Sequence, residues 1–310
     1  MELIDLNQRH YMIVDVSNLL HRTFYVHTTE DFDLITAMAY KSTFLTLNKY
    51  YKDFAPNKVV LAFDDHNNWR KKFTASGKCV TKRQYKGNRR QNLSPKQHEQ
   101  YVLFLKFIDD FEVLLKKHTS IVCIKGDELE ADDIIAGFVE AFSDEHKVTI
   151  LSQDKDFQQL LRNDNVQLCD PATKNITKRE DIDVEYLLFE KFFRGDGSDN
   201  VQNAYPGAAT KRIQKAFTDK FELANMLQHQ WIDPKDQTVY KVGDLFEENK
   251  KLMDLTKQPE EIRDRIFESI EEAFANQSRY SHFDFLRFLG QYNLKEVSKS
   301  VSNLIPLLSH

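Results

Sequence analysis

The sequence has few cysteines, no long apolar run and no stretch that resembles an export signal. Its three cysteines, Cys79, Cys123 and Cys169, are far apart, and two lie in apolar runs, which is typical of reduced core thiols rather than disulfides or zinc ligands. The start, MELIDLNQRHYMIVD, is polar where a signal peptide is apolar, and no apolar run is long enough to cross a bilayer. We therefore expect a cytoplasmic protein without membrane contact.

Acidic residues are missing from one stretch of an otherwise acidic chain. The formal net charge is −5, yet residues 66–98 contain ten Lys and Arg and no Asp or Glu, which leaves −15 on the rest of the chain. The stretch also contains Gly77, Gly87 and Pro95 and shows no long apolar period. We predict a basic, arched insertion that contacts a polyanion.

Strand-like and helical patterns alternate over the first part of the chain. Short β-branched, apolar runs predict buried strands at 11–14, 59–63, 121–124, 148–151 and 166–169. Helix-face spacing lies between several of them, for example in Leu34, Met38 and Leu45. We predict an α/β domain over residues 8–190, with a mainly parallel central sheet and helices on both faces, and a smaller α-helical domain over residues 191–310.

Carboxylates follow four of the predicted strands, most densely in GDELEADDII. A single Asp after a strand is usually a turn or a helix cap. However, the carboxyl ends of parallel strands form one edge, where ligands bind, and four independent coincidences favour one acidic site there. The residues at or after these strand ends are Asp15, Asp64, Glu130, Asp132, Asp133, Asp154 and Asp156.

A further acidic pair, Asp196 and Asp199, lies in GDGSDN before the helical part. Like charges in one cleft raise each other's pKa unless a cation neutralises them. Because the candidate ligands are carboxylates without a Cys/His cluster, we predict two Mg²⁺ or Mn²⁺ ions rather than zinc. Two such ions are a standard device for phosphodiester cleavage. In the basic stretch, Tyr85 or Trp69 would stack on a base, and Lys86 or Arg89 would reach the scissile phosphate.

Six motifs, MIVDVSN, LAFDD, QYKGNR, ELEADD, SQDKDF and GDGSDN, stand in the order typical of one nuclease superfamily. The chain resembles the 5′-nuclease or flap-endonuclease superfamily, and most closely its bacteriophage ribonuclease H branch, to which NKKLMDLTKQPEEI and FLRFLGQYNL are also similar. The resemblance implies a 5′-to-3′ exonuclease of phage DNA replication. Such an enzyme removes RNA primers from RNA–DNA hybrids, trims DNA and acts as a flap endonuclease at branched junctions.

The resemblance also implies roles for individual positions. It places Asp15, Asp64, Glu130 and Asp132 in a first metal cluster, with Asp133 beside them, and Asp154, Asp156, Asp196 and Asp199 in a second. Lys86 and Arg89 fall on positions that assist phosphate chemistry, and Tyr85 on a neighbouring aromatic position. Glu128 and Asp127 have no counterpart in the motif. As further contacts to nucleic acid in the basic stretch we count Arg70, Lys71, Lys82, Arg83 and Arg90.

Family members bind downstream duplex through a helix, turn and helix after the second acidic cluster. Here YPGAATKR retains Gly207 and Lys211, next to Arg212, and its helix N-terminus can grip a phosphate. Ala209 stands where glycine is common, which argues against a K⁺ ion at this loop. Phage members also work with a single-strand-binding protein and a sliding clamp, although no residue here proves either contact. We expect a monomer.

Other functions explain only part of the pattern. A nucleic-acid-binding domain without catalysis would account for the basic stretch, but every expected carboxylate position is occupied. A phosphatase with an aspartate nucleophile would account for VDVS, but neither for the basic stretch nor for the remaining acids. Serine- or cysteine-based hydrolysis has less support, because the ten histidines are scattered and none lies in a nucleophile motif.

Overall fold

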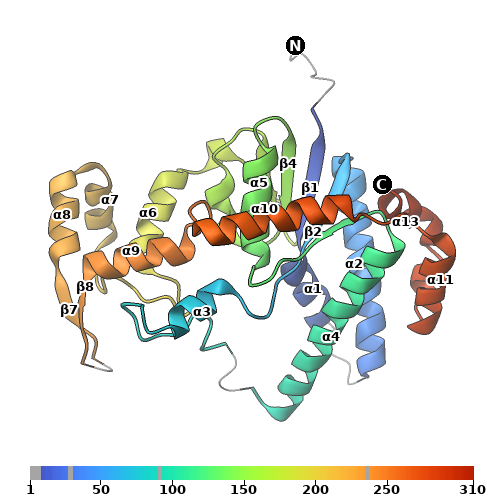
Figure 1. Cartoon of the computed structure of the whole chain (residues 1–310), viewed down its shortest axis with the longest axis horizontal. Coiled ribbons are helices and arrows are strands. Elements are labelled where there is room, and N and C mark those ends of the chain that lie inside the picture. Colours follow the sequence, from blue (N-terminus) through green and yellow to red (C-terminus); the bar gives the residue numbers. More distant parts are fainter. Residues whose placement is uncertain (1–7, 27–30, 90–92, 235–236) are drawn as a thin grey trace.

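The structure of the chain is a computed structural model that describes residues 8–26, 31–89, 93–234 and 237–310. At its centre lies a six-stranded sheet in the order β3-β2-β1-β4-β5-β6 (Figure 1). Strands β1 to β5 pair in parallel, and β6 pairs antiparallel with β5. The predicted mainly parallel α/β fold is confirmed. The strands are β1 (His10–Asp15), β2 (Lys58–Ala62), β3 (Val122–Ile124), β4 (Lys147–Leu151), β5 (Val166–Cys169) and the unpredicted β6 (Ile176–Thr177).

Helices cover both faces of the sheet. Successive residues of a strand point to opposite faces, so Met12 and Val14 join one core while Tyr11 and Ile13 join another. Two buried faces explain why these strands read as continuous apolar runs. The first core contains α1 (Val16–Tyr25), α2 (Phe32–Phe54), α4 (Pro95–His118), α11 (His282–Gln291), α12 (Lys295–Ser298) and α13 (Val301–Leu308), and the second contains α5 (Ala131–Phe142) and α10 (Glu260–Ala275). No helix in the described part of the chain is long and apolar enough to cross a membrane.

Helix α2 forms where its periodicity predicts it, but it buries a different face. The predicted face is exposed, since Leu34 and Leu45 retain 46% and 49% of their accessible surface. The buried face instead carries Tyr40 and Phe44, whose rings pack against those of Phe107, Phe111 and Phe285. Large aromatic side chains bury more apolar area than leucines do, and this gain decides which face turns inward.

The basic stretch is more structured than the predicted insertion. Its first part forms α3 (Trp69–Ala75), which begins where the Asn68 side chain accepts a hydrogen bond from the Lys71 N–H at 2.9 Å. Its last residues belong to the capped start of α4, where Ser94 and Gln97 form a capping box. The arch is therefore a loop between two helices, and α3 packs its first turn into the second core.

A third core lies in the helical region after β6. It contains α6 (Val184–Arg194), α7 (Thr210–Thr218), α8 (Lys220–Gln228) and α9 (Val242–Met253), with an unpredicted hairpin of β7 (Gln230–Ile232) and β8 (Val239–Lys241). Two short 3-10 helices, η1 (Lys155–Leu160) and η2 (Arg179–Asp181), precede it. Helices α10 to α13 return to the sheet and join the first two cores, so packed cores cross the predicted boundary at residue 190 (Figure 1).

Replacing Gly137 by alanine should destabilise the fold. An added Cβ atom would lie 2.2 Å from Cγ2 of the buried Ile266, so α5 and α10 would have to separate. We expect Gly137→Ala to lower the free energy of unfolding by about 1–3 kcal/mol in urea denaturation. Gly290→Ala is the control, since nothing lies within 4 Å of its added Cβ and alanine favours helix α11. Equal stability of the two variants would contradict the packing argument.

Candidate active site

The carboxyl edge of the sheet brings acidic residues together. Asp15 ends β1, Asp64 follows β2, and Asp154 follows β4. Some also cap helices, as the simpler interpretation expects: Asp15 accepts from the N–H of Asn18 at 3.1 Å, and Asp154 accepts from the N–H of Asp156 at 2.8 Å. Helix capping therefore contributes to fixing these carboxylates at the edge of the sheet.

A cleft of about 880 Å³ lies at this edge. It is lined by carboxylates from four strand ends and from the loop between α6 and α7, and by the cationic side chains Arg22, Lys71, Lys86 and Arg89. Eight of the nine predicted metal ligands thus share one cleft, namely Asp15, Asp64, Glu130, Asp132, Asp154, Asp156, Asp196 and Asp199.

The ninth predicted ligand, Asp133, does not face the cleft. Its side chain is fully buried, and its two oxygens accept hydrogen bonds from the Arg70 guanidinium at 2.8 and 2.9 Å. Trp69 Nε1 and the Glu130 N–H also donate to it, both at 3.1 Å. Because these donors already surround the carboxylate, Asp133 lies beside Glu130 as expected, but its prediction as a metal ligand is wrong in this structure.

Three residues predicted to touch nucleic acid are instead part of the protein interior. Arg70 is 1% exposed, and Trp69 and Tyr85 are also buried. The Tyr85 hydroxyl donates to Asp199 Oδ2 at 2.7 Å, so its ring is not available to stack on a base. The prediction failed for these residues because a basic or aromatic residue in a loop-like sequence is usually assigned to the surface. Instead, α3 turns Trp69 and Arg70 inward, and Tyr85 packs into the third core.

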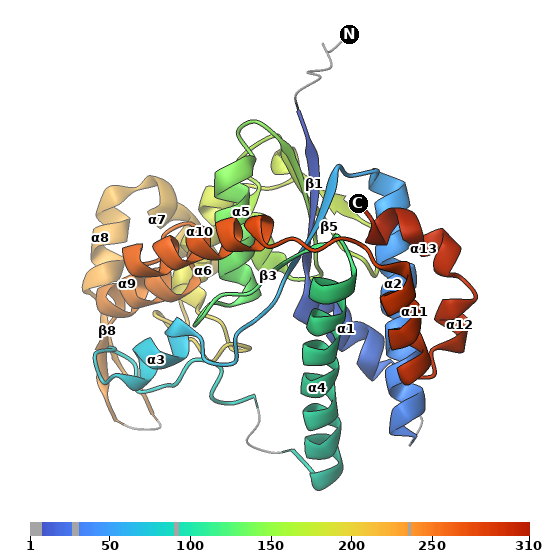
Figure 2. The ribbon, with the colours of Figure 1, turned by 45° about the vertical axis from the view of Figure 1, so that its right-hand side comes forward.

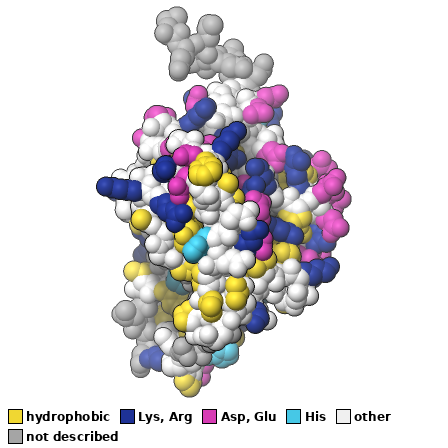
Figure 3. Space-filling model, turned by 90° about the vertical axis from the view of Figure 1, so that its left-hand side faces the viewer, with side chains coloured by type: hydrophobic (Ala, Val, Ile, Leu, Met, Phe, Trp, Pro, Cys, Tyr) yellow, Lys and Arg dark blue, Asp and Glu magenta, His cyan; other side chains and the backbone are white. Residues whose placement is uncertain are grey.

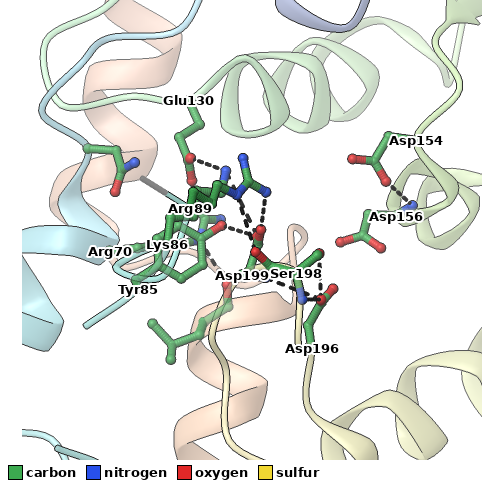
Figure 4. A network of polar contacts seen from close by, with 12 residues as sticks. Arg70, Tyr85, Lys86, Arg89, Glu130, Asp154, Asp156, Asp196, Ser198 and Asp199 are labelled. Carbon is green, nitrogen blue, oxygen red and sulfur yellow. Dashed lines mark hydrogen bonds and ion pairs between the residues drawn. The ribbon is translucent and has the colours of Figure 1, made fainter. Parts of the chain in front are cut away.

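The QYKGNR segment packs directly on the GDGSDN loop (Figure 4). The Lys86 N–H donates to the Asp199 backbone carbonyl at 2.8 Å, and Lys86 adopts the left-handed region at φ 55°. Asn88 donates to the Gly197 carbonyl at 3.1 Å, and Arg89 bonds to the Ser198 carbonyl and to the Asp199 carboxylate. Two motifs distant in sequence therefore form one side of the cleft.

Lys86 and Lys191 place positive charge among the carboxylates. Lys86 Nζ lies 2.5 Å from Glu130 Oε1 and 3.9 Å from Asp199 Oδ2. Lys191 of α6 lies 2.5 Å from Asp156 Oδ1 and 3.6 Å from Asp196 Oδ2. The sequence interpretation missed Lys191, and the available signal was its position one helical turn before GDGSDN.

Negative charge remains in excess in the cleft. Burial and the neighbouring Asp64 carboxylate raise the pKa of Asp15 to about 7. Burial also raises the pKa of Asp132, where Lys86 opposes the effect and Glu130 adds to it. Burial alone would lower the pKa of Lys86, but Glu130 and Asp199 raise it above its usual value. Additional positive charge would stabilise the ionised carboxylates.

The eight predicted ligands in the cleft are all carboxylates, which suits hard divalent cations, and His21 and His66 also line the cleft. Within residues 8–310, apart from the three undescribed internal gaps, no three His, Cys, Asp or Glu side chains already form a compact metal-binding group. Lysine and arginine side chains lie between the carboxylates instead. The residues present therefore suit Mg²⁺ or Mn²⁺ in chemistry, and side-chain rearrangement would accompany binding.

Two further predicted contacts of the arch, Lys82 and Arg83, lie outside the cleft. Lys82 Nζ donates to Thr238 Oγ1 at 3.0 Å, and Arg83 pairs with Asp233 at 3.5 Å, beside the β7–β8 hairpin. Arg90 lies outside the described residues. Their contacts with nucleic acid stay predictions.

The predicted duplex-binding loop precedes α7. Gly207 has φ +77°, Ala209 is the N-cap of α7, and Lys211 is exposed. Arg212 is held at 2.7 Å by both Glu222 and the Tyr205 hydroxyl. The side of the molecule that carries α7 and α8 shows Lys and Arg interspersed with acidic and apolar side chains (Figure 3). Duplex contact at this loop stays a prediction.

These features define an α/β protein with a carboxylate-lined cleft at the carboxyl edge of its sheet. Residues 10–205 match the family model described as 5′-3′ exonuclease, N-terminal resolvase-like domain. Because the match covers more than half of the chain, the protein belongs to the 5′-3′ exonuclease family and is a nuclease. The predicted membership of the 5′-nuclease superfamily is confirmed.

Two curated relatives are similar to the chain. The 5′-3′ exonuclease of Mycoplasmopsis pulmonis (strain UAB CTIP) is 27% identical over 282 residues, which cover 83% of this chain and 84% of the relative. The ribonuclease H of Enterobacteria phage T4 is 31% identical over 156 residues, which cover 49% of this chain and 48% of the relative.

Solved structures of a phage T5 protein share the fold. The T5 D15 protein co-crystallised with metal ions has a TM-score of 0.64 at 20% identity, covering 86% of this chain and 100% of that chain. A mutant of the T5 D15 flap endonuclease in a pseudo-enzyme–product complex with DNA and metal ions has a TM-score of 0.62 at 19% identity, with the same coverage.

Replacing Asp15 by asparagine should stabilise the metal-free protein increasingly as the pH rises. Because its pKa is raised, the Asp15 carboxyl group binds a proton more tightly in the folded protein than in the unfolded chain. The stability that this bound proton contributes is lost as the pH rises through about 7. We expect the advantage of Asp15→Asn over wild type to grow by roughly 1–3 kcal/mol between pH 4.5 and pH 8 in urea unfolding with EDTA. Asp164→Asn, at an exposed ion pair, is the control. A constant difference across pH would refute the electrostatic interpretation.

Proposed function

We propose that the protein is a metal-dependent 5′ nuclease that hydrolyses phosphodiester bonds with two Mg²⁺ ions, which Mn²⁺ can replace. The observation that carries this proposal is the cleft in which eight of the nine predicted carboxylate ligands lie beside Lys86 and Arg89. The T5 D15 structures with metal ions support the choice of a metal-dependent reaction.

The carboxylates would divide between two ions according to where they lie. Glu130 and Asp132 at the start of α5 would join Asp15 and Asp64 at the first ion. The second ion would lie among the carboxylates that follow β4 and those of the GDGSDN loop, where Figure 4 shows Asp154 and Asp156 to the right of Asp196 and Asp199. When bound, such ions lower the pKa of an attacking water and stabilise the leaving oxygen. Lys86 and Arg89, released from their acidic partners, would hold the scissile phosphate.

The proposed substrates are RNA–DNA hybrids and 5′-flap or forked DNA. The phage T4 relative is named ribonuclease H, and the T5 protein a flap endonuclease. The cleft also extends from the carboxylates to Arg22, Tyr25 and Tyr101. These residues belong to α1 and α4, which are neighbouring helices (Figure 2). A cation beside aromatic rings suits the phosphates and bases of a single strand. We assign the protein to phage DNA replication in the host cytoplasm, as a monomer, with a single-strand-binding protein and a sliding clamp as candidate partners.

Purified protein should cleave a 5′-labelled flap and an RNA–DNA hybrid in Mg²⁺ or Mn²⁺ and lose this activity in EDTA. Asp132→Asn and Asp154→Asn should reduce cleavage at least a hundredfold, because each removes a charged ligand, while binding of the same substrates stays nearly unchanged. Wild-type protein that binds these substrates without cutting either would support the alternative of a binding domain without catalysis. Wild-type turnover in either variant would remove that aspartate from the ligand set.

Lys86→Ala should lower kcat far more than it lowers affinity. Lys86 lies in the cleft beside Glu130, where charge develops on the phosphate during cleavage. We expect kcat to fall about 10²- to 10³-fold, with the Kd for flap DNA within about threefold of wild type. Lys211→Ala is the matched control, since this exposed lysine of α7 should affect affinity and its salt dependence only. A Lys86→Ala variant that loses affinity and keeps kcat would contradict the proposed role.

A further inference from the structure

A buried arginine lies directly behind one carboxylate of the cleft. Arg70 Nη1 donates to Glu130 Oε2 at 3.0 Å, and its two terminal nitrogens donate to Asp133 at 2.9 and 2.8 Å. Its Nε donates to the backbone carbonyl of Leu252, at the end of α9, at 2.8 Å. All three nitrogens of the guanidinium therefore have acceptors. The planar guanidinium fixes their directions, which a lysine ammonium cannot reproduce.

The two oxygens of Glu130 have different partners. Oε2 accepts from Arg70 in the interior, whereas Oε1 lies 2.5 Å from Lys86 Nζ in the cleft. Arg70 thus leaves one oxygen of Glu130 directed at the cleft. Without this bond, the carboxylate would be able to rotate about its terminal torsion, which is broad for glutamate.

Asp133 holds the arginine in place from the opposite side. Its carboxylate accepts from Trp69 Nε1 at 3.1 Å and from Gln258 Nε2 at 3.3 Å, in addition to Arg70. It also accepts from the Glu130 N–H at 3.1 Å, which ties it to the first turn of α5. The pair therefore joins α3, which leads into the arch, to the helix that carries Glu130 and Asp132.

We propose that Arg70, held by Asp133, is a positioning residue that orients Glu130 toward the divalent cation. The inference rests on the proposed metal-dependent function and assigns a role to two residues outside the cleft. Arg70 is buried outside the cleft, and it acts by binding Glu130 Oε2, which leaves Oε1 directed at the cleft. Outer partners of this kind commonly change metal affinity by 10- to 100-fold when they are removed.

The test is a titration of DNA-free protein with Mn²⁺, with free Mn²⁺ measured by electron paramagnetic resonance. Arg70→Lys keeps the charge but loses the fixed directions, and we expect it to weaken the tighter Mn²⁺ site about 10- to 100-fold. In EDTA, binding of flap DNA should stay within about twofold of wild type, because Arg70 is buried. The Mg²⁺ concentration that gives half-maximal cleavage should rise by a similar factor.

Two further variants separate positioning from general destabilisation. Leu304→Ala opens a cavity in the first core, remote from Glu130, and should lower the melting temperature without changing Mn²⁺ affinity. Trp69→Phe keeps a buried ring but removes one donor to Asp133, and it should weaken Mn²⁺ binding about three- to tenfold. If Arg70→Lys does not fold, Trp69→Phe is the variant that decides the test.

The outcomes distinguish this inference from the function on which it rests. If the wild-type protein binds Mn²⁺ and folded Arg70→Lys and Trp69→Phe bind it with the same affinity, the positioning role is overturned and the proposed function is not. A loss no larger than that of Leu304→Ala would overturn the positioning role as well. Absence of Mn²⁺ binding and of cleavage in the wild-type protein would overturn the proposed function together with it.

Discussion

The mutual repulsion of the carboxylates that line one cleft is the constraint on which the rest of the site depends. The acids gather there because parallel strands share a direction and end at one edge. Cations from other segments offset the repulsion: Lys86 and Arg89 come from the arch, and Lys191 comes from α6. The same charges that stabilise the metal-free protein hold the arch and the helical region against the sheet. In the proposed metal-bound enzyme, divalent cations would compete with these lysine and arginine side chains for the same carboxylates.

Buried charge links the cleft to the interior as well. Arg70 and Asp133 are both almost fully buried, and each is costly unless paired. Through Arg70, hydrogen bonds connect α3 to Asp133 of α5, to the end of α9 and to Glu130. This arrangement explains why a segment with the composition of a surface loop begins with a buried helical turn. The loop that follows is fixed at its far end by its hydrogen bonds to residues 197–200.

Prediction from the sequence succeeded where a local pattern decides the outcome. The five principal strands, the parallel sheet and the eight carboxylates of the cleft follow from apolar runs and from the acids that end them. Prediction from the sequence failed where either of two faces of one helix could be buried. In α2, Leu34 and Leu45 have the right spacing, yet Tyr40 and Phe44 are buried, because their ring partners come from α4 and α11. No local pattern contains those partners.

By itself, the sequence determined the fold class, the family motifs and the edge of the sheet at which the acids meet. Only the tertiary structure decided which of two adjacent aspartates faces the cleft. Consecutive residues of a helix differ in direction by about 100°, so Asp132 and Asp133 of α5 cannot both point the same way. Arg70, 63 positions away from Asp133, selects which one is buried. That choice depends on an ion pair between distant segments, which exists only after the chain has folded.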